Sequence, residues 1–288
     1  MAEAFFKRLG GMALDGQSAW SGEGRHTMTL SDEDRADLLY AKTLLEYPSL
    51  AARITNLVGM PIEKAFSLLP AKWSDVVTHA TRTALQKALD LAVTTMEDCG
   101  PMPSSNVLHK IIVTATGGGA GLYGLPALVI ELPVSTTVML RSIADVARSE
   151  GEKIKLLETK LACIEVFALG GRSRGDDAAE TGYFAVRAAL ARAISEAAQF
   201  IAERGFAEEG APAIVRLIAK LADRFSVSVS EKAAAQAVPV VGVVGGAIVN
   251  LIFIDHFQDV ARGHFTVRRL ERAYGPEIVR AEYERLHV

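Results

Sequence analysis

The residues most able to do chemistry stand near the C-terminus, where histidines and carboxylates follow an uncharged apolar run. Asp255, His256, Asp259 and His264 lie close together in the sequence. One helical turn would bring His256 beside Asp259, as in an acid–base pair or a pair of metal ligands. This spacing is common by chance, and no third ligand follows at a spacing typical of zinc, so we expect no metal ion. If the chain is a hydrolytic enzyme, its candidate catalytic residues are Glu131, Asp145, His256 and His264, with Arg141 beside them.

Motifs of the common hydrolase, protease and nucleotide-binding families are absent from the sequence. It contains no GxSxG, HExxH or GxxxxGK[ST], and the glycine-rich run at 116–124 does not follow a predicted strand, as a dinucleotide-binding loop would. Glu23 with His26 and Glu284 with His287 match Glu-x-x-His, but a di-iron bundle needs two further inward-facing glutamates. The sequence therefore predicts no bound cofactor.

A charged cluster begins where a long apolar stretch ends. Arg141 and Asp145 are one helical turn apart, and Arg148 follows on the same face. A charge that enters a protein core must be paired, so one interpretation is a partly buried structural network of Glu131, Arg141, Asp145 and Arg148. The alternative is an exposed helix end. Glu165, at the edge of another apolar stripe, is expected to be a solvated or rim group.

Two apolar runs dominate the hydropathy of the chain. Residues 111–140 carry one charge, Glu131, and residues 233–254 carry none. Each is long enough for the roughly 20 residues that a helix needs to cross a bilayer core. In both runs, glycines four residues apart would let another backbone approach closely. Three interpretations follow: a helical hairpin buried in an all-α domain, reversible membrane insertion or lipid binding, and a protein with two permanent membrane spans.

Permanent spans are the least favoured of the three. Glu131, Pro126 and Pro133 interrupt the first run, and no strong positive charge asymmetry flanks either run. The buried hairpin is narrowly preferred, and lipid or membrane binding comes next. The residues expected to contact a lipid or a membrane surface are Gly117, Gly121, Leu125, Pro126, Val240, Gly242 and Gly246.

The rest of the sequence has the pattern of helices, because apolar residues recur every three or four positions. The predicted helices are 74–96, 154–168, 183–201 and 212–225, preceded by one that begins at Ser31. Residues 226–230 alternate like a strand but are too few for a sheet. We predict an all-α fold, with one multi-helix domain over 31–288 that has two Gly-rich apolar helical segments at its centre. A flexible arm is expected at 1–30.

Composition excludes several classes of protein. The 288 residues carry a formal net charge of −3 and are 50% hydrophobic, which argues against a disordered chain and a general nucleic-acid binder. Cys99 and Cys163 have no CxxC or Cys/His spacing, so a disulfide scaffold and a zinc finger are excluded. The N-terminal residues do not form a secretory signal. We therefore expect a cytoplasmic protein, with a peripheral position at the inner membrane if it binds lipid.

Several short blocks together resemble the EcsC family of bacterial proteins, which is named after a companion of an ABC transporter. The resemblance covers roughly residues 75–285 and rests on Gly121, Glu131-Leu132-Pro133, Thr136-Thr137, Arg141-Ser142-Ile143-Ala144-Asp145 with Arg148, Glu165-Val166-Phe167-Ala168, Ser230-Glu231-Lys232 with Gln236, Gly242 with Gly246 and Asn250, His256-Phe257-Gln258, His264-Phe265 and Arg268-Arg269-Leu270-Glu271. The family offers no catalytic motif that can be transferred residue by residue. Its name implies an association with transport or secretion at the membrane, and some members are described as possible hydrolases.

The leading hypothesis is a non-enzymatic helical protein of this family that binds a lipid, an apolar small molecule or a membrane surface, in support of transport or secretion. The first alternative is a hydrolytic enzyme with a Glu/Asp/His site. The second is a scaffold that docks on a membrane transporter through the charged segment 255–272. A roomy apolar cavity would favour lipid binding, whereas convergent carboxylates and histidines would favour an enzyme. No nucleic-acid partner is expected.

Overall fold

The computed structural model describes residues 29–46, 49–95, 125–171, 182–205, 211–238 and 242–287. Every element in these ranges is an α-helix, which confirms the predicted all-α fold. The helices are α2 (Asp32–Glu46), α3 (Leu50–Val58), α4 (Ile62–Phe66), α5 (Trp73–Thr95), α7 (Leu125–Ser149), α8 (Leu157–Leu169), α9 (Tyr183–Arg204), α10 (Pro212–Gln236), α11 (Gly242–Tyr274) and α12 (Pro276–Arg285). Residues 1–28 of the predicted arm and 111–124 of the first apolar run lie outside the described residues.

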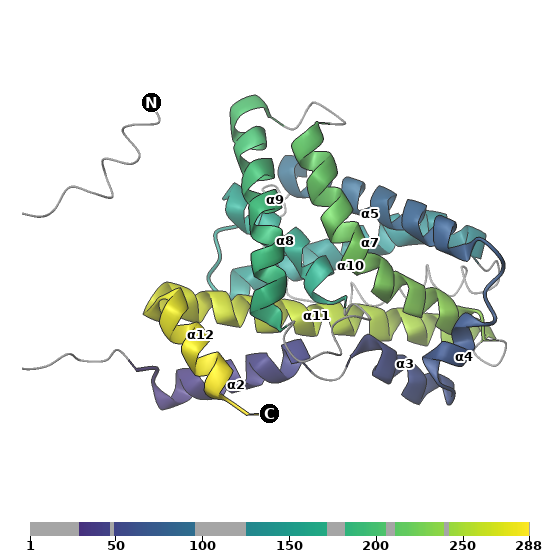
Figure 1. Cartoon of the computed structure of the whole chain (residues 1–288), viewed down its shortest axis with the longest axis horizontal. Helices are drawn as coiled ribbons and strands as arrows, with labels where there is room; N and C mark the ends of the chain where they lie inside the picture. The colour runs from purple at the N-terminus through teal and green to yellow at the C-terminus, as the bar shows by residue number, and fades with distance from the viewer. Residues whose placement is uncertain are drawn as a thin grey trace, which may run out of the picture.

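Helix α11 is the axis on which the other helices are arranged. Its 33 residues cross the molecule in Figure 1, with α2 along one flank and α12 at its C-terminal end. Helices α3, α7, α8 and α10 pack along the rest of its length. Its buried positions include Val249, Phe253, Phe257, Val260 and Phe265, at close to helical spacing. One long helix therefore positions most of the core.

The long helix predicted at 74–96 is present as α5. Its alanines at 80, 84, 88 and 92 are fully buried, and they follow one another at one-turn spacing. Such small side chains let neighbouring helices approach closely, and α7 makes the most extensive contact with α5. This pair of helices forms the upper right part of the molecule in Figure 1.

The second apolar run was predicted to be one helical segment, but the structure divides it between two helices. Helix α10 ends at Gln236, residues 237–238 leave the helix, and α11 begins at Gly242. Pro239 in the sequence explains the break, because proline lacks an amide hydrogen and disfavours helical backbone in the residue before it. The run is therefore a junction between two helices. No helix in the described ranges combines the length and the apolar character needed to cross a bilayer.

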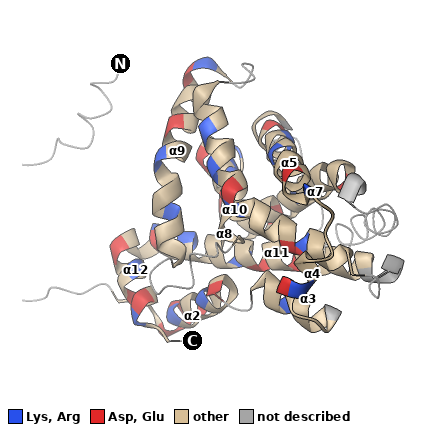
Figure 2. Ribbon diagram, turned by 45° about the vertical axis from the view of Figure 1, so that its right-hand side comes forward, with Lys and Arg blue, Asp and Glu red and all other residues tan. Residues whose placement is uncertain are grey.

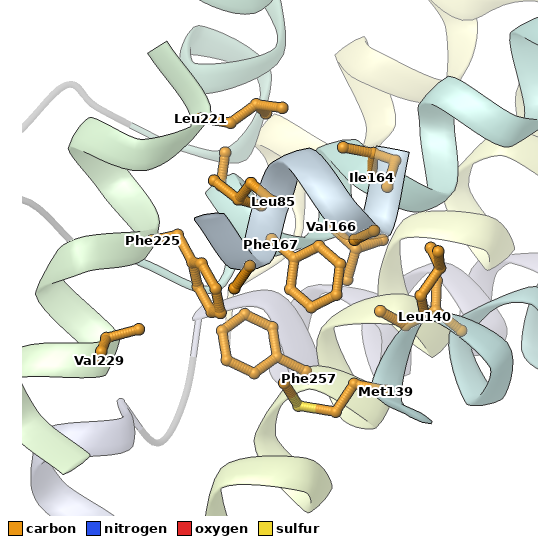
Figure 3. Packing of buried hydrophobic residues seen from close by; sticks show 14 of the residues in the cluster. Leu85, Met139, Leu140, Ile164, Val166, Phe167, Leu221, Phe225, Val229 and Phe257 are labelled. Atoms are coloured by element: carbon orange, nitrogen blue, oxygen red, sulfur yellow. The ribbon is translucent and has the colours of Figure 1, made fainter. Parts of the chain in front are cut away.

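Helix α8 lies in the centre of the core. Ten of its 13 residues are buried, from Thr159 to Ala168, although its heptad-like spacing predicted one apolar face. Figure 3 shows Phe167 of this helix beside Phe225 of α10 and Phe257 of α11. The Phe167 ring centroid is 5.0 Å from that of Phe225 and 5.6 Å from that of Phe257. Aromatic pairs at these separations add to the stabilisation from buried area.

Two glycines end α8 and let its backbone touch the neighbouring helices. A Cβ atom at Gly170 would lie 2.4 Å from the Phe257 ring, and one at Gly171 would lie 2.2 Å from the Arg224 carbonyl oxygen. Arg224 donates a hydrogen bond from Nε to the Ala168 carbonyl oxygen at 3.0 Å and another from Nη2 to the Gly171 carbonyl oxygen at 2.8 Å. The predicted helix end at these glycines is confirmed, and a side chain of α10 satisfies carbonyl groups that have no partner within α8.

Ion pairs fasten the C-terminal part of α11 to the N-terminal helix. Figure 2 shows acidic and basic residues mixed along α2 and α12. Arg269 of α11 donates to Glu150 at 3.0 Å, to Asp34 at 3.2 Å and to Asp37 at 2.5 Å. One guanidinium group thus holds α2 and the turn after α7 against α11. Because Arg269 is partly exposed, each of these pairs stabilises the fold only modestly.

The close approach at Gly170 gives a stability prediction. Gly170→Ala should lower the free energy of unfolding by about 1–3 kcal/mol, because the added methyl group overlaps the Phe257 ring. In a Gly170→Ala/Phe257→Leu variant the smaller aliphatic side chain makes room, so the two losses should be less than additive. Urea denaturation of wild type, Gly170→Ala, Phe257→Leu and the double variant measures this coupling. Wild-type stability for Gly170→Ala, or strictly additive losses, would show that the contact does not constrain α8.

Candidate functional site

The four predicted catalytic residues have different partners in the structure. Glu131 pairs with Lys232, Asp145 with Arg148, His264 with Tyr183, and His256 donates from Nε2 to the Gly170 carbonyl oxygen at 2.8 Å. These side chains do not converge on a common point where a substrate could be attacked. In the described ranges, no three His, Cys, Asp or Glu side chains are grouped as ligands of a metal ion.

The Glu131–Lys232 ion pair is buried between α7 and α10. Lys232 Nζ lies 2.8 Å from both carboxylate oxygens, and the two side chains are 0% and 4% exposed. The ammonium group also lies 4.9 Å from the centroid of the Phe253 ring of α11, within cation–π range. The pair therefore ties together three helices. Sequence analysis placed Glu131 in a charge network but named Lys232 only among the residues that carry the family resemblance.

Asp145 does not pair with Arg141, although the two residues are one helical turn apart in the sequence. Asp145 binds Arg148, one turn further along α7, and both side chains are partly exposed. Arg141 points to the surface and is exposed. Arg141, Asp145 and Arg148 lie on the side of α7 that faces water, whereas the residues between them, such as Ile143 and Ala147, are buried. The structure thus separates Glu131 from the other three members of the proposed network.

His264 and Tyr183 form a buried polar contact between α11 and α9. The Tyr183 hydroxyl lies 2.8 Å from His264 Nδ1, and His264 Nε2 has no hydrogen-bond partner among the described residues. Burial lowers the pKa of His264 well below its ordinary value, and nearby Arg187 and Arg268 lower it further. Burial likewise raises the pKa of Tyr183. Both groups are therefore uncharged at neutral pH, which suits a structural contact better than proton transfer.

The predicted lipid-contacting residues are only partly within the structure. Gly117, Gly121 and Val240 lie outside the described residues. Leu125 and Pro126 belong to α7 and Gly242 to α11, but the structure describes only their backbone. Gly246 is buried in α11. On the same two helices, however, Ile130 is 76% exposed, Val134 43% and Ile248 37%.

The segment 255–272, predicted as a contact with a membrane transporter, is mostly inside the molecule. Phe257 and His264 are fully buried, and His256 and Gln258 nearly so. Its arginines at 268 and 269 are occupied by glutamates and aspartates of this chain. The segment is therefore part of the core rather than an open docking surface.

An open groove of about 490 Å³ lies between α8, α9, α11 and α12. We call it the Glu165 groove. One part of its lining is apolar and comes mainly from α8 and α9: Leu161, Ala162, Phe184, Ala188, Ala191 and Ile194. The other part is charged: Glu158, Glu165, Arg187, Arg268, Glu271, Glu277 and Arg280. An apolar wall with a few convergent polar groups is the usual make-up of a small-molecule site.

The arginines of the Glu165 groove each hold a carboxylate. Arg187 donates to both oxygens of Glu271, at 2.7 and 3.0 Å. Arg268 donates to Glu152 at 2.8 Å and to Glu158 at 3.2 Å, and Arg280 donates to Glu284 at 2.9 Å. The bidentate pair fixes the orientation of the Arg187 guanidinium group. The Arg187–Glu271 pair is therefore a fixed part of the groove, whereas Glu158, Arg280 and Glu284 are exposed at its rim.

Glu165 differs from the other charged groups of the groove. Its side chain is 7% exposed, and it makes no hydrogen bond or ion pair with any described residue. Burial raises the pKa of its carboxyl group to about 7, although Arg187 and Arg268 oppose the shift. The expectation of a solvated or rim group is therefore wrong, because α8 is buried around most of its circumference. Titratable groups with such shifts in a cleft are candidates for functional groups.

The buried ion pair gives a second stability prediction. Lys232→Met should lower the free energy of unfolding by about 3–5 kcal/mol, because it leaves the Glu131 carboxylate buried without its partner. Glu131→Leu/Lys232→Met should be clearly more stable than Lys232→Met, because neither charge remains in the core. Asp145→Ala, on α7 like Glu131, is the control. The partly exposed pair of Asp145 with Arg148 should contribute only about 0–1 kcal/mol. Equal, small losses in chemical denaturation of all three variants would contradict a buried pair.

Comparison with known proteins identifies a family. A family model described as the EcsC protein family matches residues 41–270. This range includes α8, α9 and most of α11, and it ends before α12, which supplies the fourth side of the Glu165 groove. No curated protein and no solved structure matches the chain.

Proposed function

The chain belongs to the EcsC protein family, and we propose that this member binds a lipid or another amphiphilic molecule in the Glu165 groove without catalysing a reaction. The observation that carries the proposal is the composition of this groove, which combines an apolar wall with a charged rim. An amphiphilic molecule has the same two parts. The proposal agrees with the association with transport or secretion that the family name implies, since such processes handle lipids and membranes.

The size of the groove suits an alkyl chain. Its volume of about 490 Å³ falls within the roughly 300–1,000 Å³ of typical ligand sites. Leu161 and Ile194 offer branched apolar contacts, and alanines of α9 keep the groove open. Each methylene group removed from water against this wall contributes about 0.8 kcal/mol.

Binding accounts for the site better than hydrolysis does. A hydrolytic site needs a nucleophile or an activated water, a base, and donors for the developing negative charge, all within reach of one atom. Glu131, Asp145, His256 and His264 each have a separate partner instead. Glu165 has the pKa of a general base, but the arginines beside it hold carboxylates of this chain.

A groove-filling substitution tests lipid binding. Ala188→Leu adds a side chain at an exposed position of the groove wall, so the fold should tolerate it while the ligand loses space. Ala189→Leu is the matched control on the next residue of α9, which is exposed but does not line the groove. In native mass spectrometry of protein purified without detergent, Ala188→Leu should carry about tenfold less co-purified lipid than wild type, a loss of about 1.4 kcal/mol. Equal lipid content in all three proteins, or none in any, would contradict the proposal.

Contact with a membrane surface is a second candidate function, and one observation favours it. Ile130 and Val134 are exposed one turn apart on α7, and Ile248 is exposed near the start of α11. Both helices begin at the right-hand end of the molecule in Figure 1, far along α11 from the Glu165 groove. Isolated exposed apolar residues are ordinary, but neighbouring ones mark a candidate interaction site.

Vesicle sedimentation tests the membrane contact. Ile130→Asp/Val134→Asp should release the protein from liposomes, since apolar contacts would hold it there. High salt should release little of the wild type, because the attraction is not electrostatic. Val215→Asp is the control at a residue of α10 that is 51% exposed. Retention of the double variant, or release of all proteins by salt, would contradict an apolar contact.

A further inference from the structure

Glu165 has no hydrogen-bond donor among the described residues, in a groove whose three arginines all hold other carboxylates. Arg187 holds Glu271, Arg268 holds Glu158, and Arg280 holds Glu284. The Glu165 side chain is only 7% exposed, so its carboxylate is poorly hydrated, which costs free energy for the ionised form. A ligand group that donates to Glu165 would remove this cost, so the groove has a built-in preference for one kind of polar group.

The charges that line the groove favour a cation over an anion. Three arginines stand against four glutamates, so an ionised Glu165 leaves one negative charge in excess. A carboxylate or phosphate would meet Glu165 as a like charge, and the arginines that would attract it are already engaged. A neutral hydroxyl group could donate one hydrogen bond but would leave the excess charge uncompensated.

We propose that the groove binds a single-chain amphiphile with a primary ammonium group, which donates to Glu165 while its alkyl chain lies along Leu161 and Ile194. This inference rests on the proposed function and specifies its ligand. A primary ammonium group has three donors in a compact volume, which suits a carboxylate that lies deep in a wall. A bulkier quaternary group lacks those donors and would fit less well.

Binding of such a ligand should depend on pH through Glu165. Burial raises the pKa of this carboxyl group to about 7, whereas a primary amine stays charged up to a pH of about 10. Glu165 is therefore mostly protonated at pH 6 and mostly ionised at pH 8, and affinity should rise over that interval. The titratable and charged groups that surround it are Glu158 of α8, Tyr183 and Arg187 of α9, His264, Arg268 and Glu271 of α11, and Glu277 and Arg280 of α12. His264 stays neutral over this range because burial lowers its pKa.

Calorimetric titration with octylamine, octanol and octanoate, all below their aggregation concentrations, tests the inference. Wild type should bind octylamine about tenfold more tightly at pH 8 than at pH 6, and more tightly than octanol or octanoate at pH 8. Glu165→Gln should lose this preference and the pH dependence. Glu231→Gln is the matched control, because burial also raises the pKa of Glu231 to about 7, yet this residue of α10 lies outside the groove.

The outcomes separate the two proposals. Equal binding of octylamine and octanol, unchanged in Glu165→Gln but weakened in Ala188→Leu, would overturn the ammonium inference and leave lipid binding in the groove intact. Preference for octanoate would overturn the assigned head group in the same way. If no probe binds wild type at either pH, both proposals fail. A pH dependence that Glu231→Gln removes and Glu165→Gln retains would place the titrating group outside the groove and overturn the inference.

Discussion

The close approach of α8 to α10 and α11 is the constraint from which the rest of the structure follows. At Gly170 and Gly171 there is no room for a Cβ atom, because the Phe257 ring and the Arg224 carbonyl group occupy that space. Helix α8 is therefore held in the middle of the core, where its own Phe167 completes an aromatic cluster. Glu165, less than two turns before these glycines, is carried into the interior with the helix. Its burial is a consequence of backbone packing.

Several buried charged groups of the described interior are paired within the chain, whereas Glu165 is not. Lys232 and Glu131 enter the core together and neutralise each other, and Arg187 and Glu271 do the same at the edge of the groove. Glu165 has no such partner among the described residues. A protein gains no stability from an unpaired buried carboxyl group. A ligand that donates a hydrogen bond to Glu165 would supply the missing partner, as we propose for the Glu165 groove.

Sequence reasoning predicted the helices and missed the contacts between them. The periodicity of 74–96 correctly predicted α5, and Gly170-Gly171 correctly predicted the end of α8, because both signals are local in the chain. Lys232 and Glu131 are 101 residues apart in sequence, so no local spacing could pair them. Arg141 and Asp145 have a suitable spacing, but Asp145 pairs with Arg148, three residues further along α7, and spacing alone does not decide between the two arginines. For Glu165 the decisive fact is that α8 is buried around most of its circumference. The residues around Glu165 in α8 are apolar on most sides of the helix, a signal of all-round burial that the heptad-like interpretation overlooked.

The central claim is that Glu165 is a buried, unpaired carboxyl group that the ligand of the groove contacts. Carbon-13 NMR titration of its side-chain carboxyl group, assigned by comparison with Glu165→Gln, tests this claim most directly. The account predicts a titration midpoint at about pH 7 in the free protein, and a lower midpoint when octylamine saturates the groove, because a bound cation favours the ionised form. A midpoint near the ordinary value for glutamate, about 4.3, or a midpoint that octylamine leaves unchanged, would contradict it.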